Sequence, residues 1–234
     1  MKCNRQLPWD PKIGAAAGEM EFFIRYLVMT LLANLQAKAV RYTKDPDLVA
    51  QAKSYLFLMN NTFYLSEQLS YNYESYAPIL RNNQEAIEGD DYKIRSEWFT
   101  QQVNKLFEHS KKKYLQDWDA LNKHLVTVQQ SELSYTNSEQ NLLTLESGRV
   151  LKARFSGFND EFEKTYSLHK ELTIMDTKLR EKLVEDVKAV FLPKYRDFYD
   201  VYSKYQFSKK NMVDYLKYPP AKVETMMTDM FSSY

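Results

Sequence analysis

The segment FSKKNMVDYLKY, residues 207–218, combines positive charge with aromatic rings near the end of the sequence. Aromatic residues are ordinary core material, but a buried core does not explain the cations beside them. Residues 203–222 carry a single acid, Asp214, against five lysines. These lysines are Lys204, Lys209, Lys210, Lys217 and Lys222. Such a local excess of positive charge can attract an anionic partner.

Three interpretations of this basic segment remain open from the residues alone. Each exposed lysine gains roughly 1 kcal/mol near an anionic membrane, so several together predict weak, reversible and salt-sensitive binding. Ordinary solubilising lysines at the tip of a helical rod would have the same composition. A protein partner is the third interpretation.

No other group of residues has the spacing of a catalytic or metal site. None of His109, His124 and His169 pairs with a second ligand at a metal-binding spacing such as HExxH. The acid pairs Asp90-Asp91 and Asp160-Glu161 are adjacent, so on a helix their side chains diverge. The sequence has only five glycines and no glycine-rich phosphate loop. We therefore expect no catalytic residue, no metal and no cofactor.

Two further basic or aromatic stretches have simpler explanations. The run Lys111–Lys113 predicts a solvated helix face, with contact to lipid or a partner as the alternative. The aromatic residues within 191–207 recur at helical spacing and predict a buried core, with some tyrosine hydroxyls at its rim. A net charge of +1 argues against nucleic acid, because domains that bind phosphate backbones are usually much more basic.

The composition of the 234-residue chain predicts a helical protein of an intracellular compartment. Few glycines and prolines, with 27% charged residues, favour helices. Cys3 is the single cysteine, which excludes a disulfide framework and suits a reducing environment. The most apolar stretch, residues 26–35, is shorter than the roughly 20 residues that span a bilayer. We therefore expect a soluble or peripheral protein.

The hydrophobic pattern predicts an all-α fold, a rod of stacked antiparallel helical bundles. Residues 1–18 are expected to form a flexible leader, 19–137 a first bundle, and 138–234 a C-terminal bundle with a basic distal end. In the first helix, Phe23, Leu27, Leu31 and Leu35 define an apolar face. Pro193 is expected to kink the helix that contains it. The predicted helices cover residues 19–42, 45–69, 91–130, 138–172, 176–205, 210–217 and 219–231.

Five blocks, in order along the chain, resemble a known family. They are YLFLMNNTFYL (55–65), YLQDWDALNKHL (114–125), RFSGFNDEFEK (154–164), the stretch 179–209 that ends in QFSK, and DYLKYPPAKVETMMTDMF (214–231). These blocks resemble the C-terminal domain of the Exo-seventy subunit of the exocyst. The resemblance covers about residues 20 to 232 and implies that this chain corresponds to the C-terminal part of a longer protein.

The resemblance implies a role in exocytosis. The exocyst holds secretory vesicles at the plasma membrane before fusion, and this subunit is a non-enzymatic component of it. The family binds phosphatidylinositol 4,5-bisphosphate through its basic C-terminal end, and it contacts other exocyst subunits and Rho-type GTPases. The implied location is cytoplasmic, peripheral on the inner face of the plasma membrane. The alternative is a scaffold for exocyst assembly or GTPase binding that does not bind lipid.

The resemblance also implies which residues would bind lipid. One lysine lies in a turn and two in a K-Y-hydrophobic-K-Y motif, whose first position here is the acid Asp214. The implied lipid-binding residues are Lys209, Lys210, Lys217, Lys222, Lys152 and Arg154. Lipid binding predicts that they are exposed together on one face at one end of the protein. Scattered residues, or salt bridges to Asp214 and its neighbours, would favour the scaffold.

Overall fold

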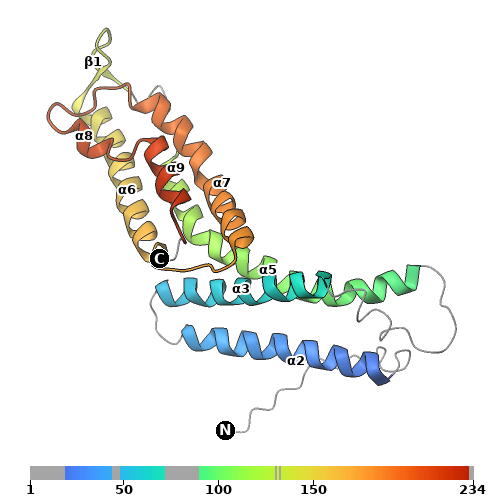
Figure 1. Cartoon of the computed structure of the whole chain (residues 1–234). Helices are drawn as coiled ribbons and strands as arrows, with labels where there is room; N and C mark the ends of the chain where they lie inside the picture. The colour runs from blue at the N-terminus through green and yellow to red at the C-terminus, as the bar shows by residue number, and fades with distance from the viewer. Residues whose placement is uncertain (1–18, 44–47, 72–89, 130, 132, 232–234) are drawn as a thin grey trace. The chain divides into compact units, whose positions relative to one another are not determined.

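The computed structural model describes residues 19–43, 48–71, 90–129, 131 and 133–231, and these are mostly helical (Figure 1). The all-α prediction is confirmed. The expected leader, residues 1–18, lies outside the described residues. The chain divides into two compact units, Met1–Lys111 and Lys112–Tyr234.

The first unit is built from α2 (Glu19–Tyr42), α3 (Leu48–Tyr71) and the beginning of α5 (Asp90–Asp119). Helices α2 and α3 lie side by side and antiparallel (Figure 1). Their core combines residues of α2, α3 and α5. It contains the buried residues Leu32, Ala39, Leu58, Val103 and Leu106, with Val28, Leu35, Phe57 and Leu65 packed against them.

The predicted apolar face of α2 is not the face that is buried. Phe23, Leu27 and Leu31 are 53%, 48% and 42% exposed, whereas Leu35 packs against the core. Steps of four residues advance about 40° around a helix at each repeat, so such a stripe winds off any fixed face. The core-facing positions 28, 32, 35 and 39, of which 32 and 39 are buried and 28 and 35 partly buried, alternate steps of four and three, which follows the 3.6-residue period.

The second unit contains the end of α5 and every element after it. A 3-10 helix, η1 (Ala120–His124), and a hairpin of β1 (Tyr135–Asn137) and β2 (Leu142–Leu143) lead into α6 (Leu145–His169). Helix α7 (Thr177–Tyr202) runs antiparallel to α6 (Figure 1). The short α8 (Met212–Tyr215) and α9 (Pro220–Thr228) complete the unit. The hairpin and α8 lie at the same end, where α6 begins and α7 ends (Figure 1).

Three predicted boundaries differ from the structure. The long helix ends at Asp119 and not near residue 130, although Leu121, Leu125 and Val128 remain buried. Residues 138–144 form hairpin and turn, and α6 begins only after Thr144, whose side chain accepts a hydrogen bond from the Ser147 N–H. The units divide within α5, because its two halves pack in different cores, whereas the expected boundary lay after residue 137.

Most of the aromatic residues within 191–207 lie in the core of the second unit, as predicted. Phe191, Tyr195, Phe198, Tyr202 and Phe207 are buried, whereas Tyr199 and Tyr205 are half-buried. The Tyr202 hydroxyl is not at the rim but buried, where it accepts from the Val128 N–H at 2.8 Å and donates to the Val128 carbonyl oxygen at 3.0 Å. The helix continues through Pro193, which lies on its exposed side.

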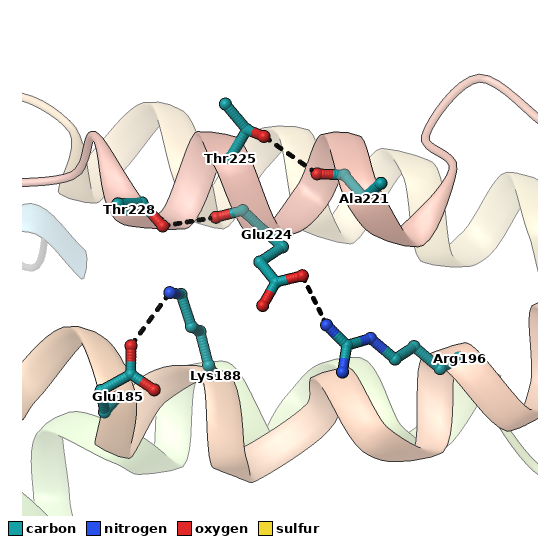
Figure 2. Close-up of polar contacts among 7 residues, drawn as sticks. All are labelled: Glu185, Lys188, Arg196, Ala221, Glu224, Thr225 and Thr228. Carbon is teal, nitrogen blue, oxygen red and sulfur yellow. Dashed lines mark hydrogen bonds and ion pairs between the residues drawn. The ribbon is translucent and has the colours of Figure 1, made fainter.

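Helix α9 packs along α7 through apolar and charged contacts. Val223 and Met227 of α9 are buried. The Arg196 guanidinium of α7 pairs with the Glu224 carboxylate of α9 (Figure 2). Thr225 and Thr228 donate back to carbonyl oxygens of their own helix, so their side chains stay with α9 (Figure 2).

His169, the last residue of α6, is a buried polar link to α5. It is 1% exposed, and its Nδ1 shares a 2.6 Å hydrogen bond with the Tyr114 hydroxyl. Its ring lies edge-on to Tyr114 and is tilted against Trp118. Its Nε2 lies 3.8 Å from a carboxylate oxygen of Asp117. Burial lowers the pKa of His169 to about 4, so the ring is neutral near pH 7.

This shift predicts a pH dependence of stability. The folded pKa lies below the unfolded value of about 6.5, so the unfolded chain binds more protons between these two values. The stabilisation from neutral His169 is complete above about pH 6.5 and is lost as the pH falls toward 4. Urea unfolding measures the free energy of unfolding of the parent chain and of His169→Gln. The difference between the two values should shrink as the pH falls from about 6.5 toward 4. A difference that stays constant would contradict the prediction.

Candidate functional site

The turn between α7 and α8, which carries Lys209 and Lys210, is fixed to the β-hairpin by backbone hydrogen bonds. The Gln206 N–H donates to the Asn141 carbonyl at 2.9 Å, and the Leu143 N–H donates to the Gln206 carbonyl at 3.2 Å. Asn141 has a positive φ of 51°, a conformation that asparagine tolerates better than most residues. The hairpin therefore holds the start of the turn in place.

The start of α6 contacts the same turn closely. A Cβ atom at Gly148 would lie 2.8 Å from the Phe207 carbonyl oxygen, so glycine is required for this approach. Further along α6, the Phe155 ring stacks on the Phe207 ring with centroids 5.2 Å apart. The turn is thus packed between the hairpin and α6.

One side of α6 also positions α8 and the residues after it. Asn159 Nδ2 donates to the carbonyl oxygens of Asp214 and Tyr215 at 3.3 and 3.0 Å. Lys152 Nζ lies 5.8 Å from the centre of the Tyr215 ring. Glu163 lies on the same side of α6, nearer its C-terminal end, and its Oε1 pairs with Lys217 Nζ at 2.6 Å. Positions 152, 159 and 163 therefore form one continuous contact with the α8 segment.

Lys209 and Lys210 are the predicted residues that remain available to an external anion. Both side chains are exposed, and neither has an ion pair or hydrogen bond with another described residue. The Asp214 carboxylate is also exposed, and no lysine of the described chain pairs with it. Asp214 therefore changes the local charge without occupying a neighbouring lysine.

Lys217 and Lys222 gather around the Tyr218 ring, with their Nζ atoms 5.3 and 4.9 Å from its centre. Lys222 Nζ also donates to the Lys217 carbonyl oxygen at 3.4 Å. The ion pair with Glu163 raises the pKa of Lys217 and lowers the pKa of Glu163. Lys217 is therefore exposed and charged, but it is partly neutralised by an acid from α6.

Arg154 does not lie with these lysines. Its guanidinium donates to the Lys123 carbonyl oxygen of η1 at 3.3 Å. Residues 152 and 154 differ by about 200° around a helix, so their side chains leave α6 on different sides. The expectation that Arg154 shares the surface of Lys152 is thus not supported by this geometry.

A shallow, open hollow of about 640 Å³ lies on the surface of the turn after α7, beside Leu142 of the hairpin. We call it the hairpin hollow, and its lining includes Leu142, Ser203, Lys204, Gln206, Ser208 and Lys209. Sequence reasoning counted Lys204 in the basic excess but did not name it as a site residue. Its lining combines residues of the turn with Leu142 of the hairpin, and the sequence predicts loop and helix where the hairpin lies.

The described residues contain neither a metal-binding cluster nor a membrane span. No three His, Cys, Asp or Glu side chains there gather in a way that could hold a metal ion. No helix in that part of the chain is long and apolar enough to cross a membrane.

Comparison with known proteins identifies the family. The family model for the C-terminal region of Exo70, a subunit of the exocyst complex, matches residues 14–229. The chain belongs to this family. The family prediction from the five sequence blocks is therefore confirmed.

Individual relatives agree with this membership. Exocyst complex component EXO70A1 of Arabidopsis thaliana is 30% identical over 206 residues, which cover 88% of this chain and 29% of that protein. Exocyst complex component 7 of Drosophila melanogaster is 39% identical over 82 residues, 35% of this chain and 12% of that protein. The chain thus spans less than a third of the length of these Exo70 relatives.

A solved structure shows the same fold. Exo70 of S. cerevisiae matches with a TM-score of 0.56 at 18% sequence identity. The match covers 91% of this chain and 36% of that one. The helical fold of the Exo70 C-terminal region is therefore present here.

The contact at Gly148 predicts that a larger residue there displaces the lysine-bearing turn. Gly148→Val should lower the free energy of unfolding by about 1–3 kcal/mol, because the atom in the way belongs to backbone that cannot rotate aside. Urea unfolding measures this loss, and the amide NMR signals of residues 203–210 should shift. Arg149→Val is the matched control on the exposed side of the same turn of α6. Equal losses in both variants would contradict the prediction.

Proposed function

We propose that this chain is the C-terminal part of an exocyst subunit that tethers secretory vesicles to the plasma membrane. In this proposal it binds phosphatidylinositol 4,5-bisphosphate through the basic end of its second unit, on the cytoplasmic side of the membrane. Membership in the Exo70 family supports the tethering role. The observation that carries lipid binding is the pair Lys209 and Lys210, exposed and free of partners among the described residues.

The electrostatics of this end suit reversible attachment. Each lysine near an anionic surface contributes about 1 kcal/mol, and this attraction falls off within a Debye length of about 8 Å at physiological salt. Lys217 can join Lys209 and Lys210, because an exposed ion pair such as Lys217–Glu163 is worth at most about 1 kcal/mol. A multivalent headgroup then competes with Glu163 for the same ammonium group.

A scaffold role without lipid is the second candidate, and a different surface favours it. Helix α2 exposes Phe23, Tyr26, Leu27 and Leu31, which recur on neighbouring turns of one helix. Apolar side chains gathered in this way suit contact with another protein chain. An exocyst subunit or a Rho-type GTPase is the partner class in this alternative.

Vesicle co-sedimentation tests lipid binding directly. The parent chain should bind vesicles that contain phosphatidylinositol 4,5-bisphosphate, and binding should weaken as salt rises. Lys209→Ala/Lys210→Ala/Lys217→Ala should reduce the affinity by up to about a hundredfold, given about 1 kcal/mol for each lysine. The matched control is Lys112→Ala/Lys113→Ala/Lys170→Ala, which removes the same charge from α5 and the C-terminal end of α6. Lys170, like Lys217, forms an ion pair with an acid, because its Nζ lies 3.9 Å from Glu171 Oε1.

The control separates a specific surface from general positive charge. If both triple variants lose affinity equally, the basic end has no special part in binding. If the parent chain does not bind at low salt, lipid binding is excluded and the scaffold alternative stands.

Asp214 gives a test in the opposite direction. Asp214→Lys restores a cation at the first position of the K-Y-hydrophobic-K-Y motif and removes a repulsive charge. Vesicle affinity should rise at least about fivefold, the factor that corresponds to roughly 1 kcal/mol. Asp160→Lys makes the same charge reversal at another exposed position of the second unit and should change the affinity less. An equal rise in both variants would show that only net charge matters.

A further inference from the structure

The N-terminal half of α2 exposes large apolar side chains on the side that faces away from the core of the first unit. Phe23, Tyr26 and Leu27 are 53%, 49% and 48% exposed. At about 100° per residue, these positions lie within about 100° of one another around the helix. Leu32, at the centre of the buried side, is at least about 120° from each of them. A helix with apolar residues on two opposite sides has a second surface that another helix can cover.

Further along the same side of α2, the residues become small and then polar. Ala33 and Ala37 are half-buried, whereas Asn34 and Arg41 are exposed. Positions 34, 37 and 41 lie within about 40° of Phe23 around the helix, so they continue the same side. This side therefore changes along the helix axis from large and apolar to small and polar.

The gradient in size makes this side complementary to itself when two copies run antiparallel. If the twofold axis passes Thr30, Phe23 of one copy lies opposite Ala37 of the second copy. In the same register Leu27 lies opposite Ala33. Large side chains opposite small ones allow two helices to approach closely and fill the space between them. A parallel pair would instead place Phe23 against Phe23 and leave the alanines facing each other.

The polar residues match in the same antiparallel register. Tyr26 lies opposite Asn34, whose side-chain amide can accept a hydrogen bond from a tyrosine hydroxyl. Helix α2 begins at Glu19 and holds Arg41 in its last turn, and positions 19 and 41 lie opposite each other. A parallel pair would place Arg41 beside a second Arg41, and like charges at an interface oppose association. Size and charge therefore favour the same orientation.

We propose that this side of α2 binds a second copy of the same chain, in an antiparallel pair of helices with its twofold axis at Thr30. In such a dimer one patch serves both copies, which is the commonest symmetry of soluble oligomers. A single pair of helices buries less than the about 1,600 Å² of a standard interface, so we expect a dissociation constant of about 1–100 µM. The inference is independent of the proposed lipid binding, because all of these residues belong to the first unit. The scaffold alternative assigns the same side of α2 to a different protein.

Sedimentation velocity of the purified chain tests the dimer without any other protein. The parent chain should change from monomer to dimer as its concentration rises through the expected range. Tyr26→Glu buries an uncompensated charge in the interface and should weaken the dimer at least about tenfold. Tyr64→Glu is the matched control, because Tyr64 is a tyrosine of α3 that is 63% exposed, and it should dimerise as the parent does. Circular dichroism shows whether each variant is folded.

Disulfide crosslinking tests the orientation and register. In a chain whose native cysteine is removed by Cys3→Ser, Thr30→Cys should form a linked dimer under mild oxidation, because position 30 faces itself across the axis. A disulfide requires Cα atoms about 4.4–6.8 Å apart. Asn34→Cys is the matched control on the same side of α2. In the antiparallel register its two copies are about 12 Å apart along the helix axis, so it should stay unlinked.

The outcomes separate a second copy from other occupants of this side. A parent chain that stays monomeric at every concentration would overturn the proposal. If Tyr26→Glu then lowers the free energy of unfolding in urea more than Tyr64→Glu does, the side is covered by other residues of the same chain. A dimer that persists in Tyr26→Glu would overturn the proposal by indicating a different surface. Equal linkage of Thr30→Cys and Asn34→Cys would overturn the antiparallel register, because only a parallel pair or random collision links both.

Discussion

The close approach of α6 to the chain at Phe207 is the constraint on which the basic end depends. Only glycine at position 148 leaves room for the Phe207 carbonyl, and the Phe155–Phe207 stack extends that contact into the core. The core continues through Phe158 and Tyr195, whose rings are stacked with centroids 3.8 Å apart. Exposed lysines cannot order a turn by themselves, because they repel one another. Here the ordering comes from apolar packing beneath them.

The same packing determines which charges meet. Helix α6 presents Lys152, Asn159 and Glu163 to the α8 segment, so one acid reaches Lys217 while none is paired with Lys209 or Lys210. The helical period places Arg154 on another side of α6, against η1. Electrostatic character at this end is therefore a result of helix geometry more than of composition. A count of lysines treats all of these positions as equal.

Much of the fold could be predicted because long helices carry a repeating apolar signal. On the predicted α7 stripe, Leu179, Leu183, Val187 and Phe198 are buried as their spacing indicates, whereas Val190 and Tyr205 are half-buried and Val201 is exposed. The hairpin could not be predicted, because its strands are two and three residues long and stabilised by contacts with Gln206, far along the sequence. The division within α5 was missed for a related reason. A continuous helical pattern does not reveal that its two halves pack in different cores.

The sequence could indicate which segment carries the candidate site, but not which of its side chains contact one another. Local charge and family resemblance both indicated residues 203–222, yet neither could show that Glu163 would reach Lys217 or that Lys204 would share a hollow with Lys209. Those relations depend on distant segments brought together by the aromatic core. The acid at the motif position, Asp214, is exposed and pairs with no lysine of the described residues, so a local count of charges does not reveal which lysines are neutralised. In this chain the hairpin hydrogen-bonds Gln206 through Asn141 and Leu143, so the lysines of the turn extend from backbone that distant segments hold in place.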